Sequence, residues 1–349
     1  MVFMKKQKYA LNLLIILALT GFALWFALKD NFHQVLKCIS QMNLLSLVIV
    51  LLWGVLFTAV WGFVYYVLGR KYTDHYTAGE GILVAFIGSF FSGITPSSTG
   101  GQFVQAYIMK KQGIKVSDGA SLLWADFIIY QTTMMIYVSI LFLLRFAYYS
   151  AQSAWFNIIL LGYIINAVVV VALYTIALFP SIYIKLSRIL VKVLTKLHIL
   201  KNPEKTLDSW TLQVTSFTRE IKVLAKDKKS ILLCVCVNVV RLSLYYSLPF
   251  VIALALHIPL KMNELIDVMA LSSFVTMANN FIPIPGASGG TEVVFSLLFS
   301  GMMKNLTGAV LVLWRFSTYH IVLIIGGVLF VFVKNHYERK ESKINLEGM

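Results

Sequence analysis

The sequence has few charged residues, few cysteines and none of the common motifs of soluble enzymes. Charged residues occupy 13% of its 349 positions, against roughly 25% in soluble domains. The three cysteines, Cys38, Cys234 and Cys236, make no metal-ligand spacing with the six histidines. No Walker loop, HExxH motif or CxxC pair occurs. We therefore expect no catalytic residues of these kinds, no cofactor and no bound metal.

What the chain does have is apolar sequence in long runs. Hydrophobic residues make up 59% of it and the mean hydropathy is +0.80, which predicts an all-α polytopic membrane protein. A helix needs about 20 apolar residues to cross a bilayer. Residues 9–28 are too long for the apolar core of a signal peptide, so we expect a retained first span there. Full spans are predicted at 9–28, 43–68, 117–144, 155–179, 231–256 and 306–333.

Two further apolar regions, 88–105 and 281–292, contain too many helix breakers to be continuous spans. Proline removes a backbone donor and pushes the residue before it out of helical geometry. Backbone groups freed in hydrocarbon cost several kcal/mol each unless protein or water surrounds them. We therefore predict two re-entrant helical hairpins that line a polar cavity. Their breakers are Pro96, Gly100, Gly101, Pro283, Pro285, Gly286, Gly289 and Gly290.

The two halves of the chain show the same order of features. Gly100-Gly101-Gln102 precedes Trp124 by nearly the same distance as Gly289-Gly290-Thr291 precedes Trp314. Within one transmembrane domain, 1–349, this gives two units of span, hairpin and span, at about 43–144 and 231–333. Chance matches in apolar sequence are the alternative explanation.

The distribution of lysine and arginine orients this arrangement. Most of these residues fall in segments that the topology places in the cytoplasm, above all the basic loop 181–229, as the positive-inside rule requires. Both termini are then cytoplasmic. The second unit would be inverted relative to the first, an arrangement typical of transporters.

Four charged residues fall inside apolar segments: Asp126, Arg241, Glu292 and Arg315. A charge at the centre of a bilayer costs about 2.5–3.5 kcal/mol or more, so each should face the bundle interior or water. We expect Glu292 beside Arg315 or Arg241, with Asp126 close by. Guanidinium groups bind phosphate through paired hydrogen bonds, and the carboxylates would meet a cationic headgroup. A purely structural ion pair is the alternative.

Polar residues next to the breakers complete the predicted lipid-headgroup cavity. A helix N-terminus that points into a cavity attracts anions, so these side chains and their backbone could donate to a phosphate. Ordinary N-capping is the alternative role. The residues are Ser97, Ser98, Thr99, Gln102, Ser288 and Thr291.

The motifs TPSSTGGQFVQAY (95–107) and PIPGASGGTE (283–292), followed by Arg315, resemble the transmembrane region of the lysylphosphatidylglycerol synthases, the multiple peptide resistance factor family. The resemblance implies a flippase region. In full-length members a cytoplasmic domain follows it and moves lysine from lysyl-tRNA onto phosphatidylglycerol, which gives resistance to cationic antimicrobial peptides. Here only residues 334–349 follow the last predicted span, whereas an acyltransferase domain needs on the order of 100 residues. We expect the membrane region without the synthase domain.

The leading hypothesis is a lipid translocase of the bacterial plasma membrane. Its expected partner is an anionic or aminoacylated phospholipid, with lysyl-phosphatidylglycerol as one candidate, and a homo-oligomer or a separate synthase stays open. Despite the net charge of +15 we expect no nucleic acid, since cytoplasmic loops and anionic lipids account for a basic balance. Two alternatives remain: a phosphatidylglycerol lysyltransferase or other lipid-modifying membrane enzyme, and a scaffold subunit that transports nothing.

Overall fold

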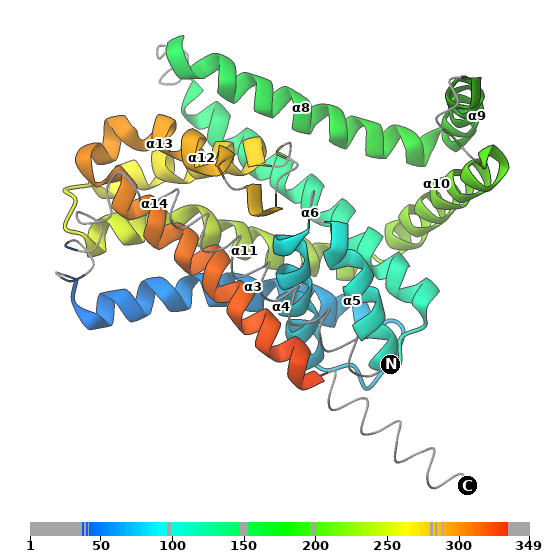
Figure 1. The fold of residues 1–349 in the computed structure, drawn as a ribbon, viewed down its shortest axis with the longest axis horizontal. Coiled ribbons are helices and arrows are strands. Elements are labelled where there is room, and N and C mark those ends of the chain that lie inside the picture. Colours follow the sequence, from blue (N-terminus) through cyan, green and yellow to red (C-terminus); the bar gives the residue numbers. More distant parts are fainter. Residues whose placement is uncertain are drawn as a thin grey trace, which may run out of the picture.

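The computed structural model describes most of the chain between Lys37 and Val333. The described residues are Lys37, Ser40, 42–95, 99–146, 153–196, 200, 202–279, 282, 285–287 and 289–333. Within these ranges all regular structure is helical and no strand occurs, which confirms an all-α membrane protein (Figure 1). The predicted first span, 9–28, lies outside the described residues.

Four helical segments among the described residues are long and apolar enough to cross a membrane. They are Leu44–Gly69, Val116–Leu144, Lys228–Ala255 and the composite segment Gly290–Val333. A bent pair, Leu160–Ile176 with Pro180–Lys196, would make a fifth. The total of six spans therefore stays a prediction.

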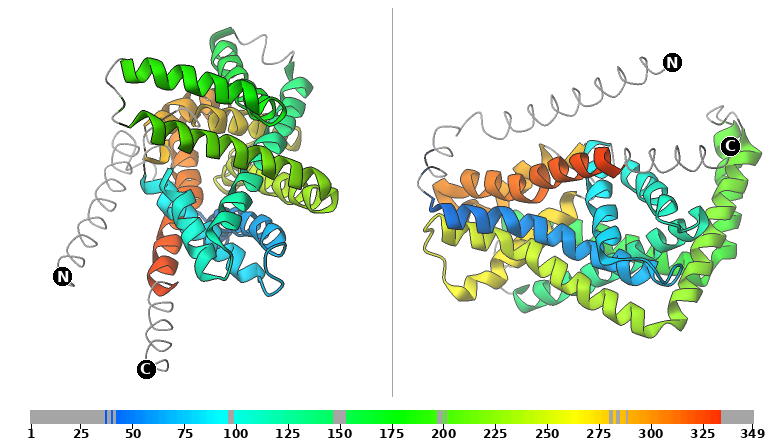
Figure 2. Two further views of the ribbon diagram at one scale, coloured as in Figure 1. Left: turned by 90° about the vertical axis from the view of Figure 1, so that its right-hand side faces the viewer. Right: turned by 90° about the horizontal axis from the view of Figure 1, so that it is seen from below.

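The centre of the bundle is a pair of long helices, α3 (Leu44–Gly69) and α11 (Lys228–Ala255), that pack along each other (Figure 2). Each begins at a side chain that accepts a free backbone N–H of the first turn. Asn43 accepts from Leu45 at 3.0 Å, and Asp227 accepts from Ser230 at 3.0 Å. Such caps fix where each helix starts. α6 (Val116–Leu144) packs against both of them.

Two helical hairpins break where the sequence predicts breaks. In the first, α4 (Ala78–Ile94) is followed by α5 (Thr99–Lys111). In the second, α12 (Leu265–Asn279) leads through the short turn η3 (Pro285–Ala287) to α13 (Gly290–Met303). The arms of each hairpin pack on one another.

The same order of packing recurs in the two halves of the chain. The first half runs α3, α4, α5 and α6, and each element contacts the next. The second half runs α11, α12, α13 and α14 (Thr307–Arg315) in the same way. The α4–α5 hairpin opens toward the end of the bundle where α9 and α10 lie, and the α12–α13 hairpin toward the other end (Figure 1). This order fits the predicted repeat, while its inverted symmetry and its orientation in a membrane stay predictions.

The last segment contains an irregular turn. α14 ends at Arg315, a π turn labelled η5 (Phe316–His320) follows, and α-helix resumes over 321–333. Outside this core lie α8 (Ser153–Leu178), α9 (Pro180–Lys196) and α10 (Pro203–Lys226). The basic loop predicted at 181–229 is therefore largely helical.

In the first half of the chain, glycine residues allow α3 and α4 to pack closely. A Cβ atom on Gly62 of α3 would lie 2.3 Å from the Ile82 Cα, and one on Gly81 of α4 would lie 2.3 Å from the Gly62 carbonyl oxygen. Both obstacles are backbone, which cannot rotate away. The pair therefore sets how closely α3 approaches the first hairpin.

We expect Gly62→Ala to destabilise the protein, because the new methyl group forces α3 and α4 apart. Overpacking of this kind costs typically about 1–3 kcal/mol. Thermal unfolding of the purified protein in detergent should show a clear fall in Tm. Gly301→Ala in α13 is the matched control, since a Cβ there meets nothing within 4 Å. Equal Tm values for Gly62→Ala and Gly301→Ala would contradict the close contact.

Candidate functional site

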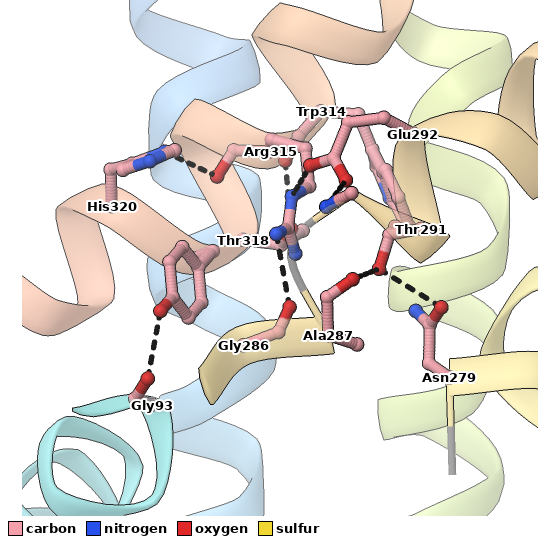
Figure 3. A network of polar contacts seen from close by, with 12 residues as sticks. Gly93, Asn279, Gly286, Ala287, Thr291, Glu292, Trp314, Arg315, Thr318 and His320 are labelled. Carbon is pink, nitrogen blue, oxygen red and sulfur yellow. Dashed lines mark hydrogen bonds and ion pairs between the residues drawn. The ribbon is translucent and has the colours of Figure 1, made fainter. Parts of the chain in front are cut away.

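A buried ion pair lies at the tip of the second hairpin. Arg315 is the last residue of α14 and Glu292 lies in the first turn of α13. The Arg315 Nε lies 2.9 Å from the Glu292 Oε1, and the Arg315 Nη2 donates to the Gly286 carbonyl at 3.0 Å (Figure 3). The two residues are 8% and 9% exposed. We call Arg315, Glu292 and Gly286 the latch.

The break in the second hairpin explains how Glu292 reaches this position. Gly286 and Gly289 have φ values of 62° and 86°, a left-handed conformation that glycine adopts at little cost. The chain can then turn sharply into α13. The Glu292 Oε2 accepts the Gly289 N–H at 2.6 Å, so this carboxylate also satisfies a free donor at the helix N-terminus, where negative charge is favoured.

Tyr319 in the π turn contacts both hairpins. Its hydroxyl donates to the Gly93 carbonyl near the end of α4, at 2.8 Å. The Arg315 guanidinium carbon lies 4.7 Å from the centre of its ring. A Cβ on Gly286 would lie 2.4 Å from the Tyr319 Cζ. One side chain therefore joins the first hairpin to the latch of the second.

The π turn is also fixed to the central helix α3. The Ser317 hydroxyl donates to the Val50 carbonyl at 2.5 Å, and the Gly54 N–H donates to the Ser317 Oγ at 3.2 Å. A Cβ on Gly54 would lie 2.1 Å from the Ser317 carbonyl oxygen. This contact holds Ser317, two positions before Tyr319, against α3.

A second charged cluster lies between α3, α6 and α11. The Trp61 Nε1 donates to the Asp126 Oδ2 at 3.0 Å. The Arg241 guanidinium carbon lies 4.4 Å from the centre of the same indole, 4.5 Å from that of Tyr130 and 5.2 Å from that of Phe57. Asp126 and Arg241 are 6% and 7% exposed. We call Asp126, Trp61 and Arg241 the indole cluster.

The two charges of the indole cluster do not form an ion pair with each other. No cation of the described residues lies within ion-pair distance of Asp126. The Arg241 Nη1 donates to the Asn238 Oδ1 at 3.4 Å, and no described residue accepts from its Nε. Cation–π contacts stabilise a desolvated guanidinium by about 2 kcal/mol or more. Aromatic faces therefore hold Arg241, and part of its hydrogen-bonding edge is not used.

Aromatic side chains connect the two clusters. Phe57, which faces Arg241, lies 4.7 Å from Tyr245 between ring centres, and Tyr245 lies 5.6 Å from Trp314. Trp314 directly precedes Arg315 in α14 and is completely buried. The indole cluster and the latch are therefore joined by continuous packing.

The structure separates the four predicted charged residues into two sets. Of the two partners predicted for Glu292, Arg315 and Arg241, the structure shows Arg315. Asp126, which we expected close to that pair, is hydrogen-bonded instead to Trp61 beside Arg241. The reason is that α6 packs against α3 and α11 at this level, while the latch is built by α13, α14 and η3.

The polar residues predicted at the breaks have mixed outcomes. Thr291 is buried, but it does not cap α13: its Oγ1 lies 2.9 Å from both the Asn279 Oδ1 and the Ala287 carbonyl, and Gly289 is the capping residue. Gln102 is exposed, whereas Gln105 is buried and donates to the Tyr65 hydroxyl at 2.9 Å. Thr99 begins α5. Pro96, Ser97, Ser98, Pro283 and Ser288 lie outside the described residues.

Several residues of the site were missed by sequence reasoning. Trp61 and Tyr319 are aromatic residues in apolar helices, where aromatic residues are frequent, so nothing in the sequence marks them. Asp267, in the first turn of α12, lies outside the broken region 281–292 and was not considered. It is buried and lies 3.0 Å from the Arg145 Nε. A search for acidic residues near every predicted helix end would have found it.

Comparison with known proteins gives the same family as the one that the motifs at 95–107 and 283–292 resemble. The model of the family described as the lysylphosphatidylglycerol synthase TM region matches residues 10–326. A UPF0104 membrane protein of Archaeoglobus fulgidus is 24% identical over 329 residues, which are 91% of this chain and 94% of that protein.

We expect Glu292→Gln to destabilise the protein strongly, because it leaves the Arg315 guanidinium buried without a counter-charge. Breaking a buried pair in this way costs about 3–5 kcal/mol. Adding Arg315→Gln should recover part of the loss, with a coupling energy of about 0.5–3 kcal/mol. The free energies of unfolding of wild type, both single variants and the double variant, measured in detergent, form a double-mutant cycle that gives this coupling energy.

Lys71→Gln is the control for this cycle. Its partner Asp227 lies 2.7 Å away, but the two side chains are 25% and 39% exposed. Pairs in such positions contribute about 0–1 kcal/mol. Additive effects of Glu292→Gln and Arg315→Gln would show that the latch does not act as a unit.

Proposed function

This chain belongs to the family of lysylphosphatidylglycerol synthase TM regions, and on that premise we propose that it is a lipid translocase. It is an integral membrane protein whose described part is a helical bundle with two broken hairpins. Under this proposal a phospholipid headgroup crosses through the bundle interior while its acyl chains stay in the surrounding lipid.

The observation that supports the proposal best is the lack of an ion pair between Asp126 and Arg241. Charges buried for stability alone are normally paired, because an unpaired charge is costly in a medium of low polarity. A site that takes up and releases a charged headgroup instead needs charges that are not already neutralised. The indole cluster offers a guanidinium over the face of one indole ring and a carboxylate at the N–H of the same ring.

We assign the two charges different roles in headgroup binding. The Arg241 Nε edge would donate to the lipid phosphate, since a planar guanidinium matches the spacing of phosphate oxygens. The Asp126 carboxylate would accept from hydroxyl or ammonium groups farther along the headgroup. An aminoacylated phosphatidylglycerol carries both kinds of group, and the family resemblance makes it the first lipid to test.

The latch has a positioning role in this proposal. Every polar atom of the Glu292 carboxylate is already engaged, by Arg315 and by the Gly289 N–H. The Arg315 guanidinium also bonds the Gly286 carbonyl and covers Tyr319. The latch therefore fixes the tip of the second hairpin, and Tyr319, which donates to the Gly93 carbonyl, connects it to the first. Movement of a lipid between them would require this contact to loosen and form again.

The membrane is proposed to be a plasma membrane, with the end of the bundle that carries α9 and α10 on the cytoplasmic side. The basic residues of that end support the assignment, because positively charged loops are retained in the cytoplasm. Both termini would then be cytoplasmic. Leaflet exchange of a fluorescent lipid in liposomes tests the proposal directly.

We expect purified protein in liposomes to speed the exchange of fluorescent phosphatidylglycerol or lysyl-phosphatidylglycerol between leaflets, measured by dithionite quenching. Arg241→Gln and Asp126→Asn should each slow it roughly tenfold or more, because a hydrogen bond to a charged group contributes about 1.5–3 kcal/mol. Asp118→Asn, near the start of the same helix α6, is the matched control and should leave the rate unchanged.

Two results would count against the proposal in different ways. No exchange of either lipid above protein-free liposomes, with correctly folded protein, would overturn the translocase. Exchange that is unaffected by Arg241→Gln would keep the translocase but move its site away from the indole cluster. In a parallel reaction with lysyl-tRNA and phosphatidylglycerol, formation of lysyl-phosphatidylglycerol would favour the enzymatic alternative.

A further inference from the structure

The chain makes a sharp corner between α8 and α9. The two helices meet at an angle of 107°, and Phe179 is the single non-helical residue between them. Pro180 opens α9, where a proline ring fits because the first turn has no partner for its missing N–H, and it pushes Phe179 out of helical geometry. The hydroxyls of Thr175 and Tyr183 lie 2.7 Å apart across the corner and fix the angle.

The outer face of α8 is apolar up to this corner. Large apolar side chains are exposed on successive turns, as expected of a helix that faces lipid along its length: Leu161, Ile164, Val168, Val171 and Leu178. The corner therefore lies where the lipid-facing surface of α8 ends. Because α9 leaves α8 at 107°, α9 would run close to the plane of a membrane that α8 crosses.

Three faces of α9 carry different chemistry. With about 100° of rotation per residue, the face around buried Val191 is turned to the protein, and α9 packs on α10 and α8. A second face is an exposed apolar stripe: Ile182, Leu186, Ile189, Leu190 and Val193. A third face, directly beside the stripe, is a row of exposed cations: Lys185, Arg188, Lys192 and Lys196. α9 contains no acidic residue.

We propose that α9 lies flat in the membrane interface and binds the headgroups of anionic phospholipids. The apolar stripe enters the boundary between headgroups and acyl chains, as in other amphipathic interfacial helices. The cations beside it extend their long side chains to the headgroups. Each lysine or arginine near an anionic surface contributes attraction, so a row of four without an acid selects negative lipids.

The neighbouring helix α10 differs from α9 in both charge and packing, which is why we assign the lipid-binding surface to α9. α10 contains the acidic residues Glu204, Asp208 and Glu220 among its basic ones. It packs against α6, α8, α9 and α11, so it connects α9 to the bundle. Nothing in the described part of the chain packs over the α9 stripe. The binding inferred here does not require that the protein move lipids, so it stands or falls independently of translocation.

The experiment uses the full chain in nanodiscs, with Cys38, Cys234 and Cys236 replaced by alanine. Leu186→Cys is labelled with an environment-sensitive fluorophore. In discs that contain phosphatidylglycerol we expect blue-shifted emission and protection from iodide, compared with phosphatidylcholine discs. Raising the salt from about 0.05 M to about 0.5 M should reverse much of the difference, because salt screens attraction at the surface.

Matched charge variants test the cations separately from the stripe. Lys185→Gln with Lys192→Gln on α9 should remove most of the phosphatidylglycerol effect. Lys222→Gln with Lys226→Gln on α10 removes the same amount of charge from exposed positions outside the row. This variant should keep the phosphatidylglycerol effect. Equal emission in both kinds of disc would overturn the inference, as would equal loss in the two double variants or a label that iodide quenches equally in every lipid.

Discussion

In the interior of this bundle, the Glu292 carboxylate accepts the Gly289 N–H with one oxygen and the Arg315 guanidinium with the other. A chain that breaks a helix inside a membrane frees backbone groups, and those groups need partners within the protein. Here the first turn of the new helix supplies the partner itself and neutralises a buried cation at the same time. Arg315 in turn fixes Gly286 and Tyr319, and through Tyr319 the end of the first hairpin.

The bundle compensates its buried charges in two physically different ways. At the latch, opposite charges touch, which gives a rigid contact with little capacity left for a ligand. In the indole cluster both charges contact Trp61: its N–H faces the carboxylate and its ring faces the guanidinium. Aromatic faces attract a cation without occupying its in-plane donors. Packing through Tyr245 and Trp314 joins the two sites, so a shift at one reaches the other through side chains in contact.

Composition and breaker residues were sufficient to predict the membrane class, the two broken hairpins and the four buried charges. These features depend on local chemistry, because a proline or a charge in apolar sequence has the same consequence in any bundle. The partners of those charges depend on how each helix is rotated, which local sequence does not encode strongly in all-apolar helices. Gln102 and Gln105 show the difficulty: they lie about one turn apart in α5, yet only Gln105 is buried. Trp61 and Tyr319 gave no signal, because aromatic residues are frequent in apolar helices.

The π turn at Phe316–His320 determines the rotational phase of the helix that follows it. A π turn closes hydrogen bonds one residue farther along than an α turn, so 321–333 is rotated relative to a continuous α-helix. In this phase Gly326 faces the first hairpin, where a Cβ would lie 2.3 Å from the Phe86 carbonyl oxygen. The same turn presents Ser317 to α3 and Tyr319 to Gly93. This five-residue π turn therefore sets the helix rotation that both contacts need. If it were regular α-helix, Gly326 would rotate away from α4 and a larger side chain would take its place in the contact.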